Sequence, residues 1–156
     1  ALAYAWDHFR EVTKLMERRG DMSVLSEYLN VIARLKRAID ESLETDVANA
    51  VKEEMSQKVH DEVYDAYAPL YPDSRREDRG GLSSVFNYDS RVEAGHLLIV
   101  ENNTPAQHPT ALPLTEIVEE GLKEYRMPFA RPFVELTEKS VNAEDALTEG
   151  LHLRGF

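Results

Sequence analysis

The sequence predicts an α+β fold in which N-terminal helices, one of them long and amphipathic, precede a small antiparallel β-sheet and a set of short helices. Apolar residues recur at spacings of three and four through the first 63 residues, which is the period of a helix. Residues 85–101 instead alternate partly between apolar and polar side chains around a turn, which predicts a β-hairpin or meander. Prolines and glycines then divide the remaining chain into short helical segments. Helices followed by strands and short helices indicate the α+β class.

Three helical segments are predicted before residue 64. The first covers residues 2–19 and the second begins near residue 21 and reaches residue 39. The third is a long amphipathic helix whose apolar residues repeat at every fourth position, namely Val47, Val51, Met55, Val59 and Val63. This spacing places one narrow apolar stripe on the helix, and we expect the stripe to pack on the sheet. Pro69 and Pro72 are expected to end the helix, because proline cannot continue its hydrogen-bond ladder.

The second half of the chain contains shorter elements. Residues 85–91 and 96–101 are the predicted strands. Thr115 is a predicted N-cap, and Asn142 with Asp145 resembles a capping box. The predicted helices after the hairpin are residues 116–125, residues 133–141 and a last turn that ends at Gly150 or Gly155.

Composition narrows the possible functions. The chain has 156 residues, a formal net charge of −11 and no cysteine, so disulfides and thiolate metal sites are excluded. Such a charge repels DNA and anionic membranes unless basic residues gather on one face. No apolar run approaches the roughly 20 residues that span a bilayer, and the first residues lack the pattern of a signal peptide. The absence of a leading Met suggests removal of the initiator, and we expect the host cytoplasm, or a particle assembled there.

No catalytic, metal or cofactor site is predicted. None of the five histidines pairs with another at the i, i+4 spacing of a helical metal site. The motif Glu93-x-x-His96 resembles half of a bundle metal site, but it lies in a turn that leads into a strand. Ser83 and Ser84 lack a nucleophile elbow, and the glycine pair before them lacks the Lys-Ser/Thr of a phosphate loop. We therefore expect a protein that is not an enzyme and holds no cofactor.

The stretch VYDAYAPLYPDSRREDRGGL, residues 63–82, gathers aromatic and basic residues within an acidic chain. Interleaved acids, Asp73, Glu77 and Asp78, nearly cancel its arginines, which argues against a phosphate-binding groove and favours ion pairs. Tyrosine and arginine are enriched at interface hot spots, so one interpretation is an assembly loop. The other is that the tyrosines cover the end of a core. The residues concerned are Tyr64, Tyr67, Tyr71, Arg75, Arg76 and Arg79.

Residues 41–156 resemble a family of tailed-bacteriophage virion proteins, the small head–tail connector or tail-completion (neck) proteins. The likeness lies in the order of four pieces: the stretch above, the strand pair, LTEIVEEGLKEYRMPFARPFVELTEKSV and ALTEGLHLRGF. The matching positions are Val63, Tyr64, Tyr67, Pro69, Tyr71, Arg75, Arg76, Gly80, Gly81, Leu82, Ile117, Gly121, Arg131, Pro132, Phe133, Gly150, Leu151, Gly155 and Phe156. Pro72 departs from the pattern, and residues 1–40 carry no part of this resemblance.

The resemblance implies an organisation and a function. Residues 1–40 would be a helical arm or extension, and residues 41–156 a tail-completion-like α+β domain. The protein would form a homo-oligomeric ring, sixfold to match a tail tube, in the neck or tail of the virion. It would contact neighbouring neck and tail-tube proteins, let DNA pass through its lumen without specific binding, and have no catalytic activity or cofactor. The alternatives are a tail terminator, a head-closure (stopper) ring, an acidic DNA-mimic inhibitor and a small hydrolase.

The resemblance also implies roles for single residues. Arg75 and Arg76 would reach the next subunit or the adjoining neck ring. Arg131 would anchor a carboxylate, either that of Glu135 or one on a neighbouring subunit. Phe133, at the start of a helix, completes the set of candidate interface residues.

Overall fold

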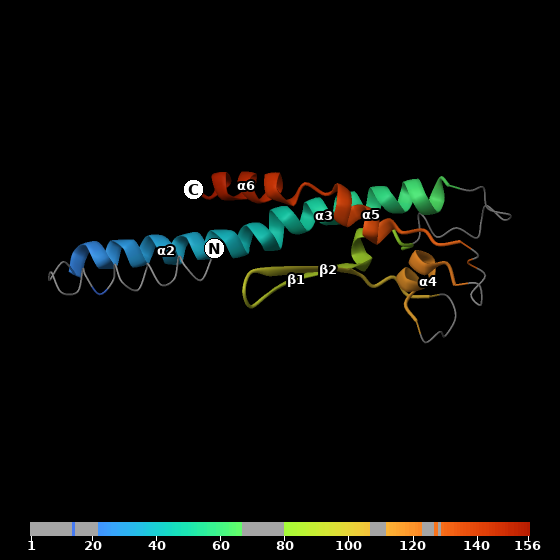
Figure 1. Cartoon of the computed structure of the whole chain (residues 1–156), viewed down its shortest axis with the longest axis horizontal. Coiled ribbons are helices and arrows are strands. Elements are labelled where there is room, and N and C mark those ends of the chain that lie inside the picture. The colour runs from blue at the N-terminus through green and yellow to red at the C-terminus, as the bar shows by residue number, and fades with distance from the viewer. Residues whose placement is uncertain (1–13, 15–21, 67–79, 107–111, 123–126, 128) are drawn as a thin grey trace. The chain divides into compact units, whose positions relative to one another are not determined.

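The computed structural model describes residues 14, 22–66, 80–106, 112–122, 127 and 129–156. The chain divides into two compact units, residues 1–39 and residues 40–156. Figure 1 labels the helices and the two strands. The predicted helix at residues 2–19 lies outside the described residues except at residue 14, and so does most of the predicted loop at residues 68–84. Helices with one small antiparallel sheet confirm the predicted α+β class.

Helical residues follow one another from Met22 to Tyr64, so the predicted second and third helices are joined. No glycine or proline occurs between these positions, and the sequence therefore offers no residue that ends a helix. The segments are α2 (Met22–Ser42), the π-helical η1 (Leu43–Val47), α3 (Ala48–Val59) and the π-helical η2 (His60–Tyr64).

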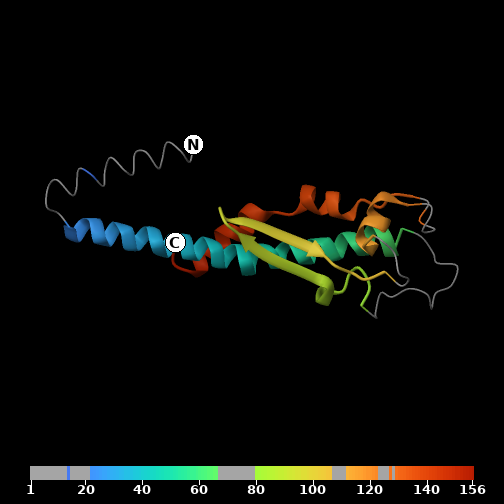
Figure 2. The same ribbon diagram turned by 90° about the horizontal axis from the view of Figure 1, so that it is seen from below.

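The β-hairpin consists of β1 (Tyr88–Glu93) and β2 (Leu97–Asn102), which pair antiparallel with Tyr88 opposite Asn102. It begins three residues later than predicted, because Val85–Asn87 form a 3₁₀ turn. The side chain of Asn87 holds this turn by donating hydrogen bonds to the carbonyls of Gly80 and Gly81, at 3.0 and 2.9 Å. Figures 1 and 2 show the hairpin running alongside α3, on a different side from α5 and α6.

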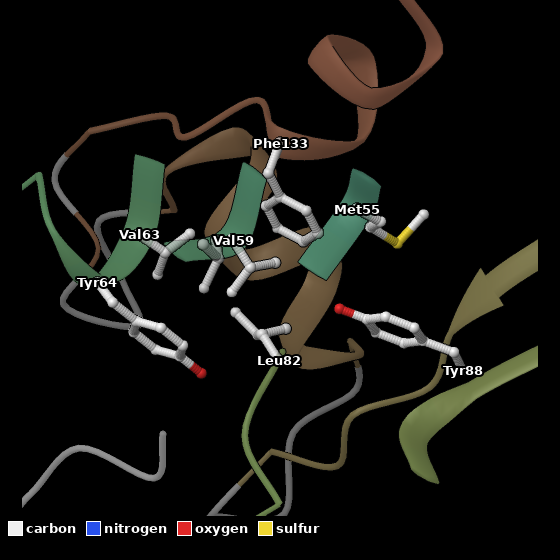
Figure 3. Close-up of a cluster of buried hydrophobic side chains, with 8 residues drawn as sticks. Met55, Val59, Val63, Tyr64, Leu82, Tyr88 and Phe133 are labelled. Atoms are coloured by element: carbon white, nitrogen blue, oxygen red, sulfur yellow. The ribbon is translucent and has the colours of Figure 1, made fainter. Parts of the chain in front are cut away.

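The core of residues 40–156 forms where α3 meets the hairpin and α5 (Figure 3). Four of the five residues in the predicted stripe are buried and Val51 is half-buried, which confirms that the stripe faces the core. Phe133 and Leu82 pack beside Val59, and the ring of Tyr88 extends from the first strand toward Met55 (Figure 3). The main cluster comprises Met55, Val59, Val63, Tyr64, Leu82, Tyr88, Val118 and Phe133.

Helix α4 (Leu114–Glu120) follows the hairpin and is tied to it and to α5. Thr115 lies inside the helix, and its hydroxyl donates to the carbonyl of Asn102 at 2.6 Å, so the prediction that it is the N-cap is wrong. Helix α5 (Phe133–Ser140) begins where predicted. The carboxylate of Glu119 accepts from the backbone N–H groups of Val134 and Glu135, at 3.0 and 3.1 Å, and so satisfies the first turn of α5.

Helix α6 (Ala143–Leu153) packs against the π-helical segment η1. Asn142 caps it by accepting from the N–H of Asp145 at 3.2 Å, which confirms the predicted capping residue. A Cβ atom on Gly150 would lie 2.5 Å from Oδ2 of Asp46 and 2.9 Å from the Cβ of Ser42. The two helical segments can therefore approach this closely because position 150 has no side chain.

Arg154 fixes the same contact through groups on four residues, Glu41, Thr45, Asp46 and Gly150, and we call this set with Arg154 the Arg154 cluster. Its Nη1 donates to Oδ2 of Asp46 at 2.6 Å and to the carbonyl of Gly150 at 2.7 Å. Its Nη2 donates to the hydroxyl of Thr45 at 2.9 Å, and Nε lies 3.5 Å from the carboxylate of Glu41. A π-helical turn departs from the i→i+4 hydrogen bonds of an α-helix. The Arg154 cluster stabilises η1 at this turn, because the guanidinium binds side chains of Thr45 and Asp46.

Replacing Arg154 with Met is expected to destabilise residues 40–156 by about 1–2 kcal/mol, because the guanidinium is partly buried and binds charged groups. Amide hydrogen exchange should rise at residues 43–47 before it rises in α3. Arg91→Met is the matched control, since Arg91 also bridges two carboxylates but is solvent-exposed. Equal urea midpoints for Arg154→Met and the wild type would contradict the role given to the Arg154 cluster.

Candidate assembly surfaces

The predicted assembly loop is described only at its two ends. Tyr67, Tyr71, Arg75, Arg76 and Arg79 lie outside the described residues.

Tyr64 lies at one end of the loop and is 8% exposed. It belongs to the core cluster and meets the ring of His60 edge-on, with the centroids 5.3 Å apart. For this tyrosine the arrangement agrees with the core interpretation.

Two further candidate interface residues lie within the described part of the chain. Phe133 is 0% exposed, because the start of α5 packs into the core, and its assignment to an interface is therefore corrected. The guanidinium of Arg131 donates to Sδ of Met127 at 3.5 Å, and its backbone N–H binds the carbonyl of Val118 at 3.1 Å. Glu135 forms an ion pair with Lys139, and the role of Arg131 as an anchor for the carboxylate of Glu135 or of a neighbouring subunit stays a prediction.

An exposed apolar surface, Val85 and Phe86, precedes the hairpin. Phe86 is 95% exposed and Val85 is more than half exposed, whereas Leu97, also more than half exposed, lies at the opposite end of the hairpin beside its turn. Sequence reasoning missed this surface because the pattern at residues 85–91 predicted a strand with Val85 and Phe86 inside it. The signal that could have revealed the turn is Asn87 following Gly80 and Gly81, since a short amide side chain favours local bonds to nearby carbonyls.

The hairpin also offers unpaired backbone groups. In the described part of the chain the sheet has two strands, so the outer edge of each lacks a strand neighbour. Exposed edges of this kind favour pairing with another chain unless charge or coverage blocks them. Arg91 supplies charge on one face, where it contacts Glu101 at 2.5 Å and Glu93 at 3.1 Å.

A second surface is a groove of about 510 Å³, which we call the acidic groove. Its apolar lining is Met55, Val100, Pro113 and Val134, and its acidic lining is Glu101, Glu116, Glu119, Glu120, Glu135 and Glu138. Glu101, Glu119 and Glu135 are engaged by the contacts given above. The other three, Glu116, Glu120 and Glu138, have no partner among the described residues.

Two titratable groups near these surfaces are perturbed. A hydrogen bond from the hydroxyl of Ser140, at 2.5 Å, lowers the pKa of Glu54 and ties α3 to α5. The stabilisation from this contact is present above the usual pKa of a glutamate and is lost as the pH falls through the lowered value. Burial raises the pKa of Tyr88, so its hydroxyl stays neutral inside the core.

Two other kinds of site are absent from the part of the chain that the structure describes. No group of three or more His, Asp or Glu side chains there is placed to hold a metal ion. Within the same residues, no helix has both the length and the apolar character needed to cross a membrane.

Comparison with known proteins places the chain in a family. No curated protein and no solved structure matches it. A family model described as YomN matches residues 21–152, which is most of the chain. This match covers the helical run, the hairpin and the helices that line the acidic groove. The chain therefore belongs to the YomN family, which is associated with bacteriophages.

Proposed function

We propose that this chain is a structural virion protein of a tailed bacteriophage. It forms a homo-oligomeric ring in the head–tail connector or tail-completion position, where the ring joins the neck to the tail tube and lets DNA pass. The role is mechanical and needs no catalytic group or cofactor. Membership of a phage-associated family supports the phage setting, and the specific position in the virion is the part that we propose.

The observation that carries the proposal is the exposed apolar surface beside unpaired sheet edges. Phe86 is almost wholly accessible, and a two-stranded hairpin is marginal without further packing. Covering Val85 and Phe86 with another subunit would remove apolar area from water and shield a strand edge at the same time. A protein that works in an assembled state can retain such a surface, because assembly covers it.

The net charge of the chain supports the proposal that DNA passes through the ring. The net charge of −11 is repeated in every subunit of a ring. An acidic lumen would repel the phosphate backbone and would leave DNA free to move. Adjacent neck rings and the tail tube are the partners that follow from this position, and the virion is the location.

Deleting the gene in a phage that carries it is expected to leave DNA-filled heads and tails of normal length that do not join. Electron microscopy of the lysate measures this, and mass spectrometry of purified wild-type virions should find the protein at a constant copy number. Tails of uncontrolled length would indicate a terminator instead. Intact infectious particles that lack the protein would overturn the proposal and would favour an acidic DNA mimic.

A further inference from the structure

We propose that the acidic groove binds the basic face of helix α2 from a second copy of this chain. The inference rests on the proposed ring and specifies how neighbouring subunits would join. The groove lies wholly within residues 40–156. It combines an apolar lining with three carboxylates, Glu116, Glu120 and Glu138, that have no partner among the described residues. Its occupant must therefore bring both apolar and cationic side chains.

The distribution of charge along the chain indicates where such an occupant is found. Residues 1–39 contain seven basic and five acidic residues, a net charge of +2. Residues 40–156 contain 11 basic and 24 acidic residues, a net charge of −13. The change of sign coincides with the boundary between the two compact units. Two copies of the acidic unit repel each other, whereas the first unit of one copy attracts the second unit of another.

Helix α2 has the side chains that the groove requires. Val31, Arg34 and Arg37 follow one another at intervals of three residues, which places them on one side of the helix. Val31 is 49% exposed, and both arginines are exposed. Val31 suits the apolar lining formed by Met55 and Val134. Arginine suits the carboxylates, because its guanidinium can bind a carboxylate through two parallel hydrogen bonds.

This pairing joins two different surfaces, so it is heterologous. Each copy would offer α2 to one neighbour and the groove to the other. A heterologous contact closes into a ring when its rotation closes, which is the assembly that the proposed function needs. The basic residues would serve subunit contacts and would leave the acidic remainder of the subunit to face DNA.

The test uses two charge-reversed proteins of full length. One carries Arg34→Glu with Arg37→Glu, and the other carries Glu116→Lys with Glu120→Lys. Glu119 is left intact because it supports α5. Each variant alone should assemble at least about tenfold more weakly than the wild type, because attraction becomes repulsion at the groove. Sedimentation velocity and light scattering measure the assembly, and circular dichroism confirms that each variant is folded.

An equal mixture of the two variants should recover assembly. The native α2 of the second variant meets the native groove of the first, and the reversed α2 of the first meets the reversed groove of the second, so both contacts that alternate around the assembly are attractive. The control variant carries Glu144→Lys with Glu149→Lys on the exposed face of α6. It makes the same change in net charge as the groove variant but away from the groove, and it should assemble like the wild type.

Three outcomes would overturn this interface. They are a wild type that stays monomeric at millimolar concentration, reversed variants that assemble as well as the wild type, and a mixture that assembles no better than either variant alone. The second outcome leaves the proposed ring intact and moves its contact elsewhere. The virion experiment is independent of all three, because loss of head–tail joining on gene deletion does not depend on how the subunits meet.

Discussion

Met55→Asp is expected to abolish the cooperative folding of residues 40–156. Met55 is 4% exposed and packs in the main cluster beside Tyr88. A carboxylate placed there must either lose its hydration or take up a proton, and both cost free energy. The side chain also borders the acidic groove, where the surrounding glutamates would repel it. The loss should exceed about 4 kcal/mol, out of the roughly 5–15 kcal/mol that stabilises a domain.

Thermal and urea unfolding followed by circular dichroism measure this effect. Met55→Leu is the matched control, because it keeps the volume and the apolar character and should cost less than about 1.5 kcal/mol. If the aspartate variant melted like the parent, the stripe of α3 would face water, and this result would contradict the packing of the hairpin on α3.

The sequence predicts the helical core of this protein well because its signal is periodic. The four-residue spacing from Val47 to Val63 admits one helical face, and that face is buried. The start of α5 was predictable for the same kind of local reason, since proline is tolerated at the start of a helix and Pro132 is the residue immediately before α5. Asn142 is a third case, because its short side chain reaches the N–H three residues later.

The predictions that failed depend on contacts between distant residues. Thr115 has the composition of an N-cap, but its hydroxyl binds Asn102, thirteen positions earlier in the chain. Phe133 has the character of an interface residue and fills the core instead. Local sequence cannot separate these alternatives, because each choice depends on which element packs against which.

The acidic groove could not be read from the sequence for a related reason. Its carboxylates come from β2, α4 and α5, and each segment alone has the composition of a solvated helix face or strand. The tertiary fold brings Glu101, Glu116 and Glu138 around one apolar lining. The exposure of Phe86 was not predicted either, because Phe86 was assigned to a strand, whereas the strand begins at Tyr88.

Gly121→Ala is expected to destabilise residues 40–156 by about 3 kcal/mol, from two separate causes. Gly121 ends α4 with a left-handed backbone, φ 67°, which costs an alanine about 1–2 kcal/mol. A Cβ atom here would also lie 2.2 Å from the backbone nitrogen of Ala130 and the carbonyl carbon of Phe129. Backbone atoms cannot rotate away, so the segment that enters α5 must move.

The substitution Gly121→Ala should also destabilise α5, because hydrogen bonds from α4 and this turn hold the start of α5. The N–H of Arg131 binds carbonyls at the end of α4, and Glu119 caps α5 from that helix. Gly155→Ala separates the two causes, since Gly155 has φ 82° but no atom within 4 Å of a Cβ. Gly155→Ala should lower the free energy of unfolding only by the cost of a left-handed backbone at an alanine, about 1 kcal/mol. Urea unfolding could instead give the same loss of free energy of unfolding for the two variants. The close approach of Gly121 to residues 129–130 would then contribute nothing to stability, and α4 and α5 would not be joined through this turn.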